Sequence, residues 1–256
     1  MVLLRPLIPL TETAVAMALR IFETDPDAKP VQRAPKPEFE RPAFQFRSGM
    51  QVRNPSTKKM DPVSLAEWRV LTDSPDTAAG IAELLGGTPE EYDATKDMNL
   101  HVLTESPAVE IVIDGSKAIE DKLILWGPTG PIHECDGEFS LLADDKGEPC
   151  GCPALMSQRK ERAAKNRGPK PSINIAFRLA GLGYELGVGK MIATAWTLAE
   201  VIHEVKNELD QVDGEALCRL ELEKVEYVSP KHGPVSYTKP VIKVLGSYND
   251  AVGEER

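Results

Sequence analysis

The sequence predicts an α+β fold: a mixed or mostly antiparallel sheet, two main helices, an extended N-terminal arm and a small cysteine-containing lobe. Strand-like segments outnumber helical ones in the 256 residues. They also follow one another in runs, whereas a parallel sheet requires strands that alternate with helices. Only two long segments show a clear helical periodicity. A chain of this length can bury a substantial core.

Residues 1–43 are expected to be a disordered leader followed by a proline-rich extended arm. The first 16 residues make a poor signal peptide, because two prolines and Glu12 interrupt their apolar run. We therefore expect a cytoplasmic protein, with residues 1–16 either a leader or a segment upstream of a natural start at Met17. The prolines of residues 25–42 exclude a helix and an interior strand. This arm lies over the domain or a partner, or it is a solvated linker.

The α+β core is expected to comprise residues 44–127 and 172–248. In its first part, a helix begins at the N-cap Ser74 with Pro75 in its first position, and it ends at Gly86–Gly87. The strands expected around it are a hairpin turning at Ser48–Gly49 within Phe44–Val52, then Leu65–Thr72, Leu100–Val102, Val109–Ile113 and Leu123–Trp126.

The second part of the core contains the other main helix, whose apolar residues from Leu198 to Leu209 recur at helical spacing. Two strands precede it, and a long hairpin follows it. The strands are expected at Ile173–Leu179, Gly189–Thr194, Leu217–Val228 and Val235–Leu245. Residues 249–256 are expected to be a disordered tail.

The lobe at residues 128–171 holds three of the four cysteines and the best candidate for chemistry. His133 and Cys135 are two residues apart, as are Cys150 and Cys152. Zinc takes four such ligands in a tetrahedron, and two close pairs can supply two corners each. A glycine at position 151 would let the chain bend so that both sulfurs face one ion. The lobe therefore holds one structural zinc, or it contains three free cysteines in a flexible loop.

A basic segment, Gln158–Lys170, follows these cysteines with six basic residues and one acidic residue. It could contact DNA phosphates or an acidic partner helix, or it could be a solvated helix. The whole chain has 30 Lys+Arg and 40 Asp+Glu, a net charge of −10. Because phosphate contacts require surplus positive charge, this balance argues against nucleic acid as the main partner.

Enzymatic alternatives have little support in the sequence. The glycines of Gly181–Lys190 have the wrong spacing for a dinucleotide or P-loop motif, and no Ser/Thr follows Lys190 to hold magnesium. The four histidines fit neither a metalloprotease motif nor a recognisable catalytic triad. No apolar run is long enough to span a membrane. We therefore expect a protein that is not an enzyme, while nucleotide binding at Gly181–Lys190 stays a minor alternative.

Ten short motifs, in order and at consistent spacing, resemble the recombination directionality factors of actinophages that encode large serine integrases, and their relatives in actinobacterial genomes. The resemblance covers roughly residues 20–245. The motifs are IFETDPDAKP (Ile21–Pro30), FRSGMQV (Phe46–Val52), LAEWRV (Leu65–Val70), AELLGG (Ala82–Gly87), VEIVIDG (Val109–Gly115), LILWG (Leu123–Gly127), CDG (Cys135–Gly137), CGCP (Cys150–Pro153), WTLA (Trp196–Ala199) and YTKPVIKV (Tyr237–Val244).

The resemblance implies a non-catalytic protein that binds its phage's own serine integrase on att-site DNA. Such factors switch the integrase from joining attP with attB to joining attL with attR, by repositioning its coiled-coil arm. They need little or no DNA binding of their own and no membrane. The alternative from another class is a zinc-stabilised nucleic-acid-binding protein that uses Gln158–Lys170.

The resemblance also bears on the zinc site and on the binding surface. Many relatives carry a further cysteine where this sequence has Pro169–Pro171. Either His133 completes the ligand set, or the metal has been lost. For the integrase-binding surface we expect the lobe, together with Phe39 and Phe44 as exposed apolar residues of the arm.

Overall fold

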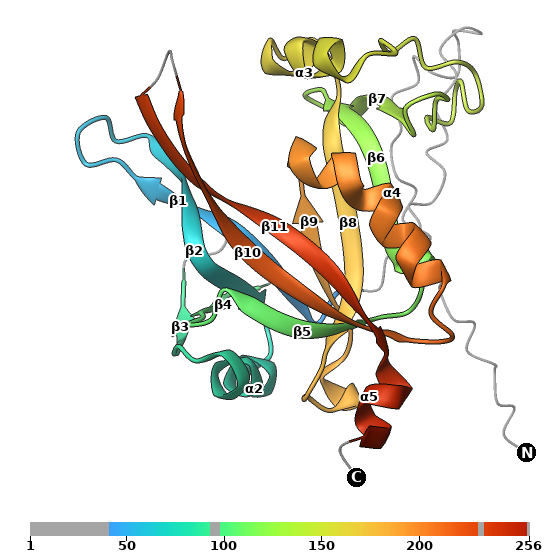
Figure 1. Ribbon diagram of the computed structural model, residues 1–256. Coiled ribbons are helices and arrows are strands. Elements are labelled where there is room, and N and C mark those ends of the chain that lie inside the picture. The colour runs from blue at the N-terminus through green and yellow to red at the C-terminus, as the bar shows by residue number, and fades with distance from the viewer. Residues whose placement is uncertain (1–40, 93–97, 230–232, 255–256) are drawn as a thin grey trace, which may run out of the picture. The chain divides into compact units, whose positions relative to one another are not determined.

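The computed structural model describes residues 41–92, 98–229 and 233–254. The arm predicted for residues 1–43 therefore lies almost wholly outside the described residues, as does Phe39. Within the described part, eleven strands form one mixed sheet. The predicted α+β class is confirmed (Figure 1).

The strands are antiparallel to their neighbours except where β1 pairs with β9 in parallel. The main path through the sheet is β11-β10-β5-β8-β9-β1-β2-β4-β3, and β6 pairs with both β7 and β8. The strands are β1 (Phe44–Arg53), β2 (Met60–Thr72), β3 (Pro89–Glu91), β4 (Leu100–Leu103), β5 (Ala108–Ile113), β6 (Ile119–Trp126), β7 (Pro131–Cys135), β8 (Lys170–Leu179), β9 (Gly189–Ala193), β10 (Ala216–Ser229) and β11 (Gly233–Ser247).

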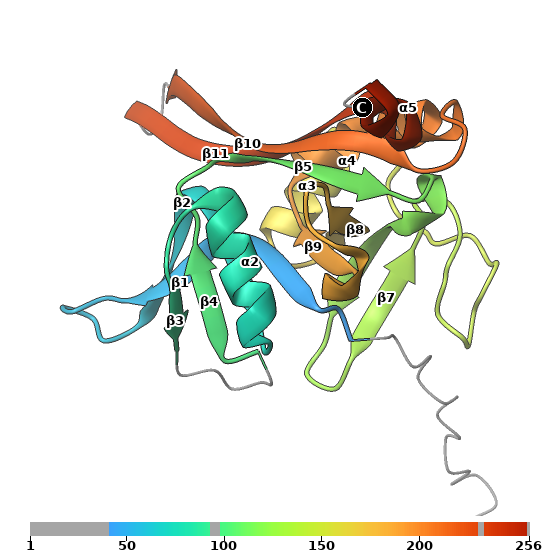
Figure 2. The same cartoon turned by 90° about the horizontal axis from the view of Figure 1, so that it is seen from below.

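The two predicted main helices are present. Helix α2 (Pro75–Leu85) begins as expected, because the Ser74 hydroxyl accepts a hydrogen bond from the Thr77 N–H, and it ends at Gly86. Helix α4 (Trp196–Asp210) packs against β11, β8 and β6, and α2 packs against β2 and β4 (Figure 2). The shorter helices are α3 (Met156–Ala164), α5 (Tyr248–Glu254), η1 (Ser116–Ala118) and η2 (Tyr184–Leu186).

An aromatic cluster occupies the centre of the core. The rings of Phe44, Phe46 and Phe177 meet edge to face, and Trp68 packs on Phe46 at 5.4 Å between ring centres. The Trp68 indole N–H donates to the Pro107 carbonyl at 2.9 Å, so this buried polar atom is satisfied. Strand β8 alternates strictly between buried and partly exposed residues, which orients one of its faces toward this core.

The sheet curls, so that the long β10–β11 hairpin meets β2 from the far end of the strand order. The Thr238 hydroxyl donates to the Leu65 carbonyl at 2.8 Å and lies 2.7 Å from the Ser64 hydroxyl. Thr238 is 174 positions from Ser64 and 173 positions from Leu65 in the sequence. Strand β6 pairs with β8 on one side and with β7 on the other, and the β6–β7 hairpin forms the base of the lobe.

Three predictions need correction. Phe44–Val52 is not a hairpin: it is one strand whose register shifts between Arg47 and Gly49, so Ser48–Gly49 marks a β-bulge. The predicted tail is not without structure, because α5 extends to Glu254. Phe44 is not an exposed contact residue, because it is only 1% exposed in the aromatic core.

Candidate metal centre

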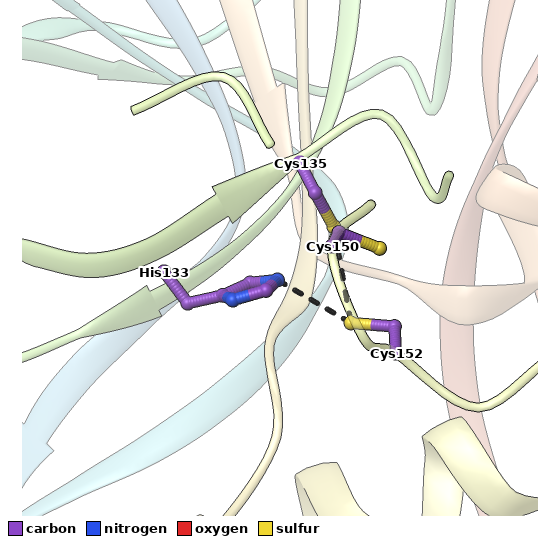
Figure 3. Close-up of side chains that lie close together, drawn as sticks. All are labelled: His133, Cys135, Cys150 and Cys152. Carbon is purple, nitrogen blue, oxygen red and sulfur yellow. Dashed lines mark hydrogen bonds between the residues drawn. The ribbon is translucent and has the colours of Figure 1, made fainter. Parts of the chain in front are cut away.

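The structure brings together all four predicted ligands. His133 and Cys135 lie two residues apart on β7, and alternate residues of a strand share a face. Cys150 and Cys152 come from the loop before α3. Gly151 between them has φ +67°, the left-handed conformation that glycine adopts most easily. The four side chains converge on one point (Figure 3).

The distances between ligand atoms fit a tetrahedral zinc ion. All four lie within 4.8 Å of one another. The sulfurs of Cys135 and Cys152 are 3.9 Å apart, and the Cys152 sulfur is 3.3 Å from His133 Nε2. Zinc bonds of about 2.3 Å to sulfur and about 2.0 Å to nitrogen place tetrahedral ligand pairs about 3.5 to 3.8 Å apart. Three thiols and one imidazole are also a donor set that zinc prefers.

Without a metal, burial keeps the thiols of Cys135 and Cys152 protonated. The pKa of the Cys135 thiol is raised to about 12, mainly by burial and also by the neighbouring sulfurs, while the Gly137 N–H acts in the opposite direction. Burial likewise raises the pKa of Cys152, against the opposing charge of Arg159. Metal ligands are thiolates, so zinc binding here would displace protons from the cysteines.

Arg159 joins the two segments that carry the cysteines. From α3, its Nη2 donates to the Gly137 carbonyl at 2.7 Å, two residues after Cys135. Its Nε donates to the Pro153 carbonyl, the residue after Cys152. One guanidinium therefore fixes the spacing of two ligand segments that lie far apart in the sequence. Sequence reasoning missed this role, because nothing local distinguishes Arg159 from the other basic residues of α3.

The lobe has very little apolar core of its own. Within residues 128–171, the buried hydrophobic residues among those described are Cys135 and Ala163. Larger apolar side chains of the same segment are exposed: Ile132, Phe139, Leu155 and Met156. A small unit with so little buried apolar surface usually needs a metal or a disulfide to hold it. The cysteines here are free thiols, so a metal is the fitting candidate.

Backbone and ion-pair contacts complete the lobe. The Asp136 carboxylate accepts the N–H groups of Glu138 and Phe139, both at 2.8 Å, and these bonds lower its pKa. Lys160 of α3 pairs with Glu200 of α4, which ties the lobe to the core. Of the basic segment Gln158–Lys170, residues 158–164 lie in helix α3, and Lys170 begins β8.

The glycines of Gly181–Lys190 serve packing. A Cβ placed on Gly189 would lie 1.9 Å from the Phe44 ring, so this position needs glycine for close approach. The segment leads into β9, where Lys190 is paired with Gln45 of β1. A phosphate-binding loop would instead lead into the N-terminus of a helix. The structure therefore gives no support to nucleotide binding at this segment.

A second polar cluster surrounds His101 on β4. Its Nδ1 accepts a hydrogen bond from Arg69 Nε at 2.9 Å, and its Nε2 lies 3.5 Å from the Glu90 carboxylate. The Tyr92 ring is tilted against the imidazole, and Arg69 lies over that same ring. Burial and then the charge of Arg69 lower the pKa of His101, while Glu90 opposes the shift. The cluster holds a buried, neutral histidine on β4.

Membrane and structural comparisons add two findings. In the described segments, no helix is long and apolar enough to cross a membrane. No solved structure matches this chain.

The family comparison matches most of the chain. The family model described as Gp3-like, recombination directionality factor-like, matches residues 45–244. This span includes the lobe with the metal centre and the whole sheet except Phe44 of β1 and residues 245–247 of β11. It agrees with the resemblance seen in the sequence motifs. The chain therefore belongs to the Gp3-like family of recombination directionality factor-like proteins.

Proposed function

We propose that this protein binds a large serine integrase and switches it from joining attP with attB to joining attL with attR. The observation that carries the proposal is the family match over residues 45–244. The net charge of −10 supports a protein partner more than free DNA. In this proposal the integrase performs all strand cleavage, and the present protein contributes binding energy without catalysis.

The switch is a shift between two populations of integrase–DNA complex. A ligand changes such an equilibrium only through its different affinities for the two states. Moving the ratio from 1:99 to 99:1 requires about a 10⁴-fold preference, or about 5.5 kcal/mol. A protein interface of ordinary size supplies this difference in binding free energy without any catalytic step. The condition is that one arrangement of the integrase presents a surface that the other arrangement hides.

The metal centre has a structural role in this proposal. Zinc held by His133, Cys135, Cys150 and Cys152 would fix the conformation of the lobe, whose own apolar core is small. The lobe could then present exposed apolar and basic side chains in a defined arrangement. No step of recombination passes through the metal.

An in vitro recombination assay tests the function. The cognate integrase is incubated with attL and attR, and separately with attP and attB, with and without this protein. We expect excision to appear and integration to be suppressed only when both proteins are present. Unchanged products in both reactions with an active cognate integrase would contradict the proposal.

The alternative is a zinc-stabilised nucleic-acid-binding protein, which the exposed basic residues on and after α3 favour. Such a protein would bind att-site duplex in the absence of integrase, with an affinity that falls steeply with salt. A gel-shift titration at two salt concentrations distinguishes the two functions before any recombination is measured.

A further inference from the structure

A pocket lies beside the metal centre, between the β6–β7 hairpin and α3. The pocket opens onto the metal centre, because His133, Cys150 and Cys152 line it. Its apolar residues are Leu125, Pro153 and Pro169, and its basic residues are Arg159, Arg162 and Arg167. The combination of apolar and guanidinium groups is typical of a surface that receives an acidic side chain from another protein.

Arg162 and Arg167 differ from the neighbouring lysines Lys160 and Lys165 in their charge partners. Lys160 pairs with Glu200, and Lys165 pairs with Glu161. Arg162 and Arg167 are both exposed and form no ion pair with a carboxylate of the described residues. The whole chain has ten more acidic than basic residues. The two arginines at this pocket therefore give it a charge opposite in sign to the net charge of the chain.

We infer that this pocket forms the docking site for an acidic segment of the integrase. The inference rests on the proposed function. One or two carboxylates of the segment pair with Arg162 and Arg167, and its apolar side chains contact Leu125, Pro153 and Pro169. A DNA backbone fits less well, because a row of phosphates would meet the acidic surface of the rest of the chain.

The test measures binding of the purified cognate integrase to the full-length protein by biolayer interferometry. The double variant Arg162→Glu/Arg167→Glu reverses the charge of the pocket. Lys146→Glu makes a charge reversal at an exposed lysine of the same lobe, outside the pocket. Zinc content and melting temperature are measured for all three proteins, so that a loss of binding is not confused with a loss of folding.

We expect the double variant to bind integrase at least about tenfold more weakly, because unlike charges become like charges at the contact. The Lys146→Glu control keeps wild-type affinity. Equal affinity of the double variant and the wild type overturns the docking site but leaves the proposed function standing. If the double variant loses zinc or folding, Arg162→Ala/Arg167→Ala replaces it, and unchanged binding by that variant overturns the inference.

Two further outcomes separate the site from the function. If the wild type binds att-site duplex without integrase, and the double variant loses that binding, the pocket receives phosphate and the inference is overturned. If the wild type does not bind the integrase, free or on its DNA, the proposed function fails, and the docking site fails with it.

Discussion

Replacement of Cys152 by serine should remove the metal and destabilise the lobe. Cys152 is the best ligand to change, because its sulfur contacts both the Cys135 sulfur and the His133 ring. A hydroxyl is a poor zinc ligand, so three donors and a weak fourth remain. We expect the variant to be purified without stoichiometric zinc, whereas the wild type carries one ion per chain.

The size of the effect follows from the linkage between binding and folding. A ligand present at 1,000 times its dissociation constant stabilises the folded state by about 4 kcal/mol. For a body of this size each kcal/mol shifts the melting temperature by about 2–4 °C, so the expected loss is about 10 °C. If the lobe melts separately from the sheet, the loss takes the form of a new transition at lower temperature.

Zinc analysis and differential scanning calorimetry provide the assay. Cys218→Ala is the matched control: Cys218 is also a buried thiol, but it lies on β10, outside the cluster. Burial raises its pKa to about 12, so it is a neutral core group. The control should keep its zinc, and chelation of the wild type should reproduce the Cys152→Ser melting curve. A wild type without zinc that melts at the same temperature as Cys152→Ser would refute the reasoning.

Three other changes have expected outcomes. Gly189→Ala should lower stability in urea denaturation by about 1–3 kcal/mol, because the new Cβ meets the Phe44 ring at 1.9 Å; an unchanged midpoint would show that the ring moves freely. Arg159→Ala should weaken zinc binding by about tenfold or more in a chelator competition, since it frees the two ligand segments; equal affinity would deny it a positioning role. His101 has a lowered pKa when folded, so the unfolded chain binds more protons and stability should fall as the pH drops below the unfolded value of 6.5. His101→Asn should flatten that dependence in melting curves recorded across this range, and an equally steep loss in the variant would assign it to other groups.

The elements that could be predicted from the sequence are those specified by local signals. Helix α2 has a capping serine, a proline in its first turn and two terminal glycines, all within 14 residues. The strict alternation of β8 and the helical spacing of α4 are equally local. Each of these patterns is contained in a short stretch of sequence, and each of these predictions was confirmed.

The errors concern features that depend on partners distant in the chain. Ser48–Gly49 has the composition of a turn, but pairing with β2 makes it a bulge. The position of Phe44 at the end of a proline-rich segment suggested exposure, whereas contacts with Phe46 and Phe177 bury it. Strand β7 lacks an apolar alternation and forms because β6 offers an edge.

The cluster of four candidate metal ligands was predictable, but its surroundings were not. Two close pairs of donors predict a site from spacing alone. The bridge from Arg159 to Gly137 spans 22 residues and has no pattern in the sequence. The pocket at Arg162 and Arg167 likewise depends on how α3 packs beside the β6–β7 hairpin.

The most direct measurement of the central proposal is recombination by the cognate integrase in the presence of this protein. The proposal predicts that attL and attR are joined only when both proteins are present, and that joining of attP with attB is suppressed at the same concentration. It also predicts no recombination by this protein alone. If an active integrase gives the same products on both pairs of sites with and without the protein, the proposal is wrong.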